Sequence, residues 1–342
     1  MTDYAKNLDA ARHAVAAASI VCRSVQDALD DVRAMTKDDK SPVTVADYAS
    51  QAVVGYALRE RLGRVTLVAE EASNFLRDED NALFLAATLA AVKEVWEDAT
   101  EESVLEAIDI GAGDTDHRAF WTLDPIDGTK GFLRNQQYAV ALGYIEDGTP
   151  TIGVMGCPNL PIDLSEPLDE RDPHGCMYLA VKNEGVYETR CDTDKGEMTR
   201  ITRLDHEPGD EISVCGSVEA AHSNQDDTAR ILEWIEAQGL ARVGEPARLD
   251  SQCKYAVVAR GQADAYLRLP TKKGYVERIW DHAAGCCIAN ESGAVVTDIF
   301  GRNLDFSQGR GLEKNIGVVC APPRVHGMMI RAIEALGIGK LS

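Results

Sequence analysis

Residues 123–132, LDPIDGTKGF, constrain the fold of this chain more than any other segment. Pro125 fixes its own φ and disfavours a helical conformation at Asp124, whereas Gly128 can adopt a positive φ. The segment therefore predicts a rigid turn at the C-terminal end of a strand, with Asp124 and Asp127 able to face one pocket. The alternative is a surface turn whose aspartates hydrogen-bond their own backbone.

Three further segments place carboxylates at the ends of predicted elements. An apolar strand ends at Glu70 and Glu71, Asp47 is expected to begin a helix after a short strand, and Asp281 begins another helix. Carboxylates gathered in one cleft repel each other and are tolerated mainly when cations bind between them. Oxygen ligands without histidine or thiolate favour Mg²⁺, Mn²⁺ or Ca²⁺ over zinc. The four segments together predict a site for such ions.

The residues after the second aspartate suit a phosphate. Gly128 and Thr129 supply backbone N–H groups and a hydroxyl at the start of a predicted helical turn, an arrangement that favours an anion. Two Mg²⁺ ions can activate a water and stabilise the leaving oxygen of a phosphoryl displacement. Half a metal site joined to a phosphate-binding turn therefore indicates metal-assisted phosphoryl chemistry.

Composition excludes several classes of function. The formal charge of −21 over 342 residues argues against a nucleic-acid partner, which needs a basic surface. The nine cysteines show no zinc-site spacing, so we expect buried free thiols and a cytoplasmic location. The longest hydrophobic, charge-free run, residues 81–92, is too short to cross a bilayer, and Asp3 and Asp9 precede any apolar stretch at the N-terminus, so neither a membrane anchor nor a signal peptide is expected.

Hydrophobic patterns divide the chain into two parts. Apolar residues recur at steps of three and four from Leu8 to Val32 and predict a long helix packed on its own domain, so a monomer is expected and a dimer remains open. An acidic, largely helical insertion is expected over residues 73–118, followed by strands and hairpins. We predict an α+β part over residues 1–205, and an α/β part over 206–342 from its alternation of strands and helices.

The sequence resembles the lithium-sensitive, magnesium-dependent phosphatase superfamily of inositol monophosphatase and fructose-1,6-bisphosphatase. The resemblance covers about residues 5–335 and rests on DPIDGTKGF, WDHAAG (280–285), VAEE (68–71) and SPVTVADYASQ (41–51). It implies an α/β layered fold, an α-β-α-β-α sandwich. Within the superfamily the chain is most similar to the 3′(2′),5′-bisphosphate nucleotidases, which remove the 3′-phosphate from adenosine 3′,5′-bisphosphate.

The resemblance also implies roles for individual residues. Two or three Mg²⁺ ions would be held by the carboxylates of Glu70, Asp124, Asp127 and Asp281 and by the main-chain carbonyl of Ile126. Asp47 and Thr129 would orient and deprotonate the attacking water, while backbone groups of Gly128 and Thr129 would hold the scissile phosphate. His222 would lie near the adenosine, and the ribose and the uncleaved phosphate would be held by Ser251, Lys254 and Arg268.

A locally basic segment supports the second phosphate independently of the resemblance. Residues 251–279 contain six basic and two acidic side chains in an otherwise acidic chain. Lysine and arginine converging beside a metal site would recognise a second phosphate, which a monophosphate substrate lacks. A solvated basic face is the alternative.

These features lead to one expected reaction and two alternatives. The expected reaction is Mg²⁺-dependent hydrolysis of adenosine 3′,5′-bisphosphate to AMP and phosphate, with 3′-phosphoadenosine 5′-phosphosulfate as a second substrate and sensitivity to lithium and sodium. Inositol polyphosphate 1-phosphatase activity is the first alternative. The second is a non-catalytic nucleotide sensor, which would have no use for Asp47 and Thr129.

Two departures from the family pattern stand out. Ala69 and Ala72 flank the glutamate pair where the family often has glycine before it and a polar residue after it, which leaves the role of Glu71 open. Asn135 stands where glycine is common, and we expect only a change in loop shape there.

Overall fold

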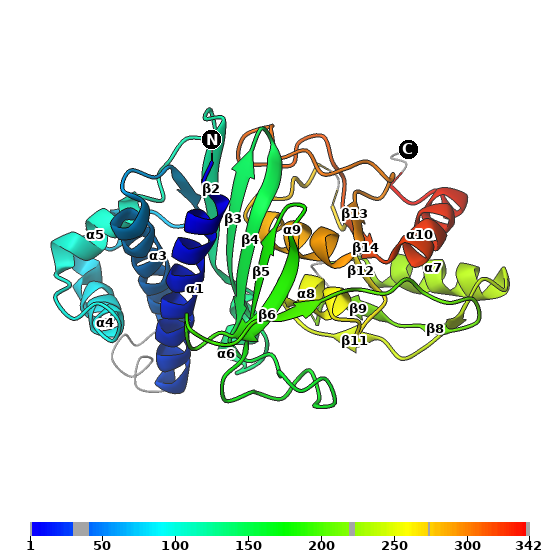
Figure 1. The fold of residues 1–342 in the computed structure, drawn as a ribbon, viewed down its shortest axis with the longest axis horizontal. Helices are drawn as coiled ribbons and strands as arrows, with labels where there is room; N and C mark the ends of the chain where they lie inside the picture. Colours follow the sequence, from blue (N-terminus) through cyan, green and yellow to red (C-terminus); the bar gives the residue numbers. More distant parts are fainter. Residues whose placement is uncertain (1, 30–40, 219–222, 273, 340–342) are drawn as a thin grey trace.

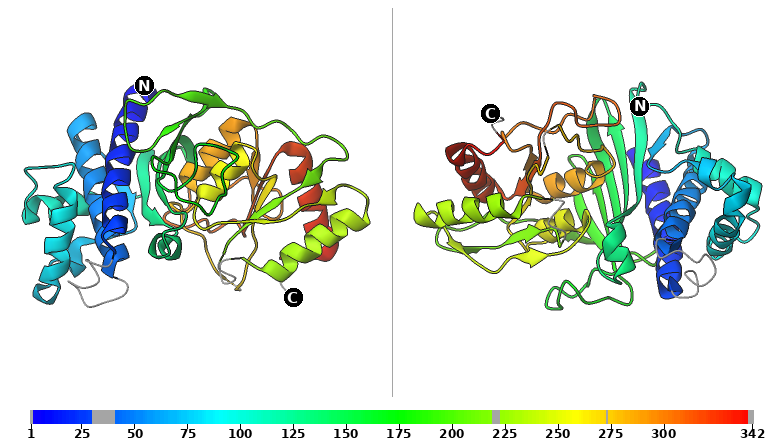
Figure 2. Two further views of the ribbon diagram at one scale, coloured as in Figure 1. Left: turned by 90° about the horizontal axis from the view of Figure 1, so that it is seen from below. Right: turned by 180° about the vertical axis from the view of Figure 1, so that it is seen from behind.

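Helices and sheets alternate in layers across the molecule (Figure 1, Figure 2). The computed structural model describes residues 2–29, 41–218, 223–272 and 274–339. Helices α1 (Tyr4–Asp27) and α3 (Ser41–Leu62) cover the outer face of a first sheet. Helices α8 (Cys253–Ala259) and α9 (Ala283–Ser292) lie between this sheet and a second one. The far face of the second sheet is covered by α7 (Gln225–Ala237) and α10 (Pro323–Leu336). The predicted α-β-α-β-α sandwich is confirmed.

The first sheet carries the predicted carboxylate turn. In the described residues it has seven strands in chain order, with β1 (Leu67–Ala69) parallel to β2 (Ala119–Asp127) and antiparallel pairs thereafter. The remaining strands are β3 (Ala139–Glu146), β4 (Thr149–Cys157), β5 (Cys176–Val181), β6 (Gly185–Arg190) and β7 (Thr199–Ile201). Asp147 and Gly148 both have positive φ between the antiparallel strands β3 and β4, which form one of the hairpins expected after the insertion.

The second sheet is mixed and smaller. Its order among the described residues is β11 (Ala247–Arg248), β9 (Val214–Gly216), β12 (Ala265–Arg268), β14 (Val318–Ala321) and β13 (Val295–Thr297). A separate parallel pair joins β8 (Glu211–Ile212) and β10 (Arg242–Val243). The predicted alternation of strands and helices in this part is confirmed, whereas its division from the first part at residue 206 stays a prediction.

The two long N-terminal helices pack through small side chains. Asp3 caps α1 by accepting a hydrogen bond from the backbone N–H of Lys6 at 3.0 Å. Most of the predicted apolar stripe, including Ala11, Val15 and Cys22, is buried, while Leu8 at its start is partly buried. Its predicted end lies partly in residues 30–40, outside the described residues.

The expected strand before Asp47 is wrong. Helix α3 begins at Ser41, so Asp47 lies within the helix rather than at its start. The β-branched run favoured a strand, but burial of Val45 and Ala46 in the helical core outweighs that local preference.

The insertion between β1 and β2 is largely helical, as predicted. It contains two short 3₁₀ turns, η1 (Ser73–Phe75) and η2 (Glu79–Asn81), followed by α4 (Ala82–Val92) and α5 (Glu101–Asp109). Helices α4 and α5 both pack against α3. No helix in the described ranges combines the length and the apolar character needed to cross a membrane.

Candidate active site

A cavity of about 460 Å³ lies where the C-terminal end of β2 meets the segments that follow β11 and β12. Most of the predicted site residues line it: Glu70, Asp124, Ile126, Asp127, Gly128, Thr129, Ser251, Lys254, Arg268 and Asp281. Segments far apart in the sequence therefore meet at one site. Two predicted residues are not among those that line the cavity: Asp47, which is described below, and His222, which falls outside the described residues.

The carboxylate turn is held in a conformation that requires glycine. The pairing of β2 with β3 is irregular between Asp124 and Asp127, and Gly128 follows with a φ of 93°. A Cβ atom on Gly128 would lie 2.8 Å from the Cβ of Ser251, closer than real Cβ atoms approach. The turn therefore needs glycine both for its backbone and for its contact with the loop before α8. Helix α6 (Thr129–Leu133) begins immediately after it.

The loop before α8 ties the two parts of the molecule together. Ser251 adopts a positive φ of 68°, and the next backbone N–H, that of Gln252, donates to Asp127 Oδ2 at 2.5 Å. The Gln252 side-chain amide donates to the carbonyl of Trp280 at 2.8 Å. Gln252 thus links the carboxylate turn to the segment that carries Asp281. No periodicity in the sequence pointed to this residue.

The carboxylates repel one another. Asp124 is buried, and its Oδ1 atom has no hydrogen-bond partner among the described residues. Burial, with repulsion from Asp127 and Glu70, holds the pKa of Asp124 well above its usual value. Glu70 stays exposed to the cavity, but partial loss of water and repulsion from Asp281 raise its pKa to about 7. Burial raises the pKa of Asp281 to about 6, against the opposing effect of Arg268.

Asp47 belongs to the same electrostatic cluster. Its pKa is raised by burial and then by repulsion from Glu71 and Glu70, and its charge in turn raises the pKa of Asp124. Glu71 itself shares a hydrogen bond with the side chain of Tyr48, one residue along α3. The role that the sequence left open for Glu71 therefore includes contact with the helix that carries Asp47.

The unpaired carboxylates fit a hard cation. Asp124 presents a buried oxygen without a donor among the described residues, and mutual repulsion helps to raise the pKa values of Asp124 and Glu70, although Arg268 lies 3.7 Å from Asp281. Bound cations would restore the balance of charge. Carboxylate and carbonyl oxygens without thiolate match the ligands of Mg²⁺.

Two of the basic residues predicted to bind substrate line the cavity beside this cluster, as does Lys130. Lys254 is buried, its Nζ atom donates to the carbonyl of Leu249 at 3.3 Å, and burial lowers its pKa. Arg268 ends β12 and is paired with Glu277 through contacts of 2.9 and 2.7 Å. The sequence had counted Glu277 only as a negative charge in a basic segment, so this pairing was missed.

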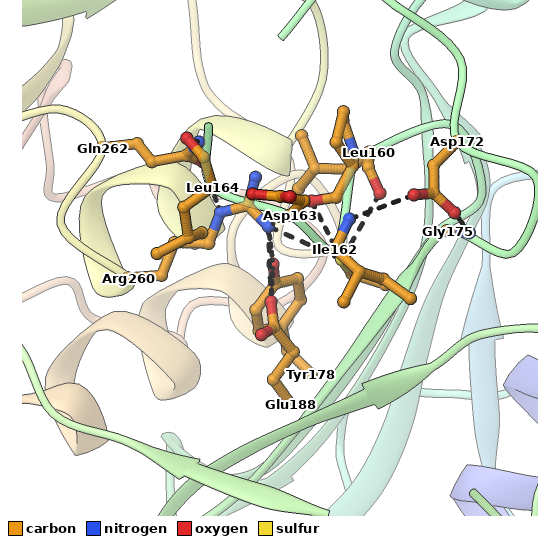
Figure 3. Close-up of polar contacts among 12 residues, drawn as sticks. Leu160, Ile162, Asp163, Leu164, Asp172, Gly175, Tyr178, Glu188, Arg260 and Gln262 are labelled. Carbon is orange, nitrogen blue, oxygen red and sulfur yellow. Dashed lines mark hydrogen bonds and ion pairs between the residues drawn. The ribbon is translucent and has the colours of Figure 1, made fainter. Parts of the chain in front are cut away.

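The other basic residues of that segment do not converge on the cavity. Arg260 is buried elsewhere, where Nη1 donates to the carbonyl of Pro161 at 2.8 Å and to the Tyr178 hydroxyl at 3.0 Å (Figure 3). The Arg278 guanidinium lies 5.8 Å from the ring centroid of Trp280, and Lys272 is exposed. Lys273 lies outside the described residues. The predicted convergence of basic side chains therefore reduces, in the described residues, to Lys254 and Arg268.

The layered fold and the oxygen-lined cavity are those of a metal-dependent phosphatase class. The family model of the inositol monophosphatase family matches residues 6–337, and the chain belongs to this family. A relative in Schizosaccharomyces pombe named 3′(2′),5′-bisphosphate nucleotidase is 41% identical, over 89% of this chain and 86% of that protein. Relatives with the same name in Emericella nidulans (43%; 88% and 90%) and, numbered 1, in Arabidopsis thaliana (40%; 97% and 96%) are also similar.

Solved structures agree on the fold. An inositol monophosphatase from Anabaena (Nostoc) sp. PCC 7120 superimposes with a TM-score of 0.60 at 19% identity, covering 99% of both chains. CysQ from Bacteroides thetaiotaomicron, a bacterial member of the inositol monophosphatase family, gives a TM-score of 0.58 at 20% identity over 92% of this chain and 97% of that chain. At such low identity these structures support the fold alone.

Proposed function

We propose that the chain is a 3′(2′),5′-bisphosphate nucleotidase, which hydrolyses the 3′-phosphate of adenosine 3′,5′-bisphosphate with Mg²⁺ as the cofactor. One observation carries the proposal: a single cavity joins a cluster of carboxylates, including the unpaired Oδ1 of Asp124, to the basic side chains of Lys254 and Arg268. Such a cavity suits a substrate with one phosphate at the metal site and a second one nearby. The names of the relatives support the same substrate class.

The carboxylate side of the cavity performs the reaction. Two or three Mg²⁺ ions would be held by Glu70, Asp124, Asp127, Asp281 and the carbonyl of Ile126, and when bound they supply the positive charge that acidifies water and stabilises the leaving oxygen. Thr129 orients the attacking water, and Asp47 accepts its proton. The water oxygen bonds to phosphorus as the bond to the ribose 3′-oxygen breaks. That oxygen takes up a proton from a solvent water and leaves as a hydroxyl, and Asp47 returns the proton it accepted to solvent.

The basic side of the cavity binds the rest of the substrate. Ser251, Lys254 and Arg268 hold the ribose and the second phosphate, while backbone groups of Gly128 and Thr129, on the carboxylate turn, hold the scissile phosphate. His222 is proposed to contact the adenosine. We expect 3′-phosphoadenosine 5′-phosphosulfate to be a second substrate, because it carries the same 3′-phosphate.

We further propose a monomer that acts in the cytoplasm. All nine cysteines are buried free thiols, which suits a reducing compartment. Helix α1 packs its apolar stripe against α3 and the first sheet of its own chain, as a monomer requires.

The test is phosphate release from adenosine 3′,5′-bisphosphate with Mg²⁺ and with EDTA, beside AMP and inositol 1-phosphate as comparison substrates. We expect Mg²⁺-dependent release from the bisphosphate and little from the other two. Preferential release from inositol phosphates would contradict the proposed substrate, and no release from any of them would favour a sensor.

The catalytic assignment has its own test. Asp47→Ala and Thr129→Ala should reduce hydrolysis by orders of magnitude while nucleotide binding persists. Asp9→Ala, which removes an exposed carboxylate on α1, serves as the control and should behave as the unmodified protein. Normal turnover in the first two variants would refute the assignment.

A further inference from the structure

A network of four polar side chains, three of them buried, lies beside the cavity. The Arg268 guanidinium donates through Nε to Glu277 Oε1 at 2.9 Å and lies 2.7 Å from Oε2 through Nη2. Glu277 Oε2 also lies 3.3 Å from His282 Nε2, and the opposite ring nitrogen of His282 is 2.8 Å from the Tyr255 hydroxyl. Glu277, His282 and Tyr255 are each almost completely shielded from solvent.

This chain joins the elements that build the basic side of the cavity. Arg268 ends β12, His282 is the N-cap of α9 beside Asp281, and Tyr255 follows Lys254 on α8. Glu277 lies in the segment between β12 and α9, and its carbonyl accepts a hydrogen bond from the Leu312 N–H at 2.8 Å. The backbone of Glu277 is therefore anchored next to the cavity.

The two-point contact with Glu277 restricts the Arg268 side chain. Both Glu277 oxygens face the guanidinium, which makes the planar geometry that carboxylates and arginine prefer. Arg268 Nη2 is held 3.7 Å from Asp281 Oδ2 and 3.5 Å from the Tyr275 hydroxyl. An arginine fixed in advance loses less conformational entropy when it binds an anion. Its position relative to Asp281 is set before any substrate arrives.

We propose that Glu277 is a positioning residue that fixes the Arg268 guanidinium relative to Asp281 and thereby sets how far from the metal site a second phosphate of the substrate can bind. The inference rests on the proposed function and names a determinant of its specificity. Glu277 itself touches neither the reacting phosphate nor the second one. It favours substrates whose two phosphates match the separation between Asp281 and Arg268.

The arrangement of Glu277, Asp281 and His282 allows a competing interpretation. Ligand atoms of Glu277, Asp281 and His282 lie within 4.8 Å of one another, close enough to hold a metal ion. Both carboxylate oxygens of Glu277 already contact Arg268, however, and a cation there would be repelled by the guanidinium. The geometry thus favours an ion pair that positions Arg268.

The test compares a substrate with two phosphates and one with a single phosphate. Adenosine 3′,5′-bisphosphate and adenosine 3′-monophosphate are hydrolysed by the unmodified protein and by Glu277→Gln, which keeps the shape of the side chain and removes its charge. We expect the ratio of kcat/KM for the two substrates to fall by about 10- to 100-fold, mainly through KM of the bisphosphate. Hydrolysis of the monophosphate should fall by a much smaller factor.

A matched control separates positioning from general destabilisation. Asp264 directly precedes β12 and pairs with Arg203 at 2.5 Å in a similarly shielded setting outside the cavity lining. Asp264→Asn should lower the melting temperature about as much as Glu277→Gln without changing the substrate ratio. In an Arg268→Ala background, Glu277→Gln should change the ratio no further, because Glu277 acts through Arg268.

Each outcome decides the inference. If the unmodified protein hydrolyses neither substrate, the proposed function fails. If it hydrolyses the bisphosphate and Glu277→Gln keeps the full substrate ratio, the function stands and the positioning role is overturned. The positioning role is also overturned if the variant needs more Mg²⁺ for both substrates equally, since Glu277 would then act at the metal.

Discussion

The two sides of the cavity differ in whether their charged side chains have counter-ions within the protein. On the carboxylate side, Glu70, Asp124 and Asp281 have raised pKa values, and Asp124 has an oxygen without a donor among the described residues. On the basic side, Arg268 already has its counter-ion in Glu277. Carboxylates without enough counter-ions need a bound cation to balance their charge. An arginine that already has a carboxylate partner is instead held in place before the ligand binds. The first arrangement suits a metal and the second suits recognition of substrate.

The largest effect should come from neutralising the unmatched side. Asp124→Asn should reduce kcat/KM by about a thousandfold, because a metal ligand of the reacting site is lost. The same change removes a buried charge, so the metal-free variant should melt at a higher temperature than the metal-free parent protein at pH 7.5. Phosphate release measures the expected loss of activity, and thermal unfolding in EDTA measures the expected rise in melting temperature. Loss of activity together with a lower metal-free melting temperature would contradict the contrast between the two sides.

A matched pair away from the cavity should affect stability without affecting the reaction. Glu188 Oε1 lies 3.3 Å from Nη1 of the buried Arg260 (Figure 3). The substitution Glu188→Ala leaves that guanidinium without its counter-ion. We expect a loss of about 3–5 kcal/mol in the free energy of unfolding, measured with urea, because an unpaired buried charge is costly. The value of kcat/KM should stay within about twofold of the parent. A large loss of activity in a still-folded variant would show that Arg260 influences the cavity.

The stability of the metal-free protein should depend on pH in a defined direction. The pKa is raised from 4.5 to about 7 for Glu70 and from 3.8 to about 6 for Asp281. Because the folded state holds these protons more tightly than the unfolded state, stability is greatest below about pH 4 for these two groups and is lost as pH rises to about 7. We expect the melting temperature in EDTA to fall by about 2–4 °C between pH 5 and pH 7.5, and stabilisation by Mg²⁺ to grow over the same range.

The control for this pH dependence is Glu70→Gln, which removes one of the two titrating groups. It should flatten the fall in melting temperature in EDTA. A metal-free melting temperature that rises between pH 5 and pH 7.5 would show that the carboxylates find counter-ions within the protein.

The sequence predicted the carboxylate side better than the basic side for a physical reason. Asp124, Asp127 and Gly128 belong to one short segment whose proline and glycine fix its conformation, so local rules suffice. The pair between Arg268 and Glu277 depends on a segment without regular structure between β12 and α9, where spacing carries no information about contact. Arg260 shows the same limit, because its counter-ion comes from β6.

Asp47 illustrates a different failure. Its chemical assignment followed from the segment around it, yet its place in the fold did not, because β-branched neighbours favour a strand locally. Packing of α3 against α1 and the first sheet decides the conformation instead. The local sequence therefore identified Asp47 as a site residue but predicted the wrong secondary structure around it.

The smallest effect should come from the loop that supports the carboxylate side. Asn135 follows α6 with a φ of 56°, in the left-handed region that asparagine and glycine tolerate better than alanine. The carbonyl oxygen of Gln137, two residues after Asn135, would lie only 2.1 Å from a Cβ atom placed on Gly131. The loop therefore packs closely against helix α6. Asn135→Ala should cost about 1 kcal/mol of unfolding free energy, whereas Asn135→Gly should change it by only a few tenths.

Thermal unfolding and phosphate release of these two variants measure how stiffly the turn is supported. If the metal-binding carboxylates are positioned by β2 and the contact between Gly128 and Ser251, both variants should keep kcat/KM within about twofold of the parent. A tenfold loss in Asn135→Ala alone would mean that strain in the loop reaches Asp127. The carboxylate side would then depend on positioning by neighbouring residues as much as the basic side depends on Glu277, and the contrast between the two sides would lie only in their charge.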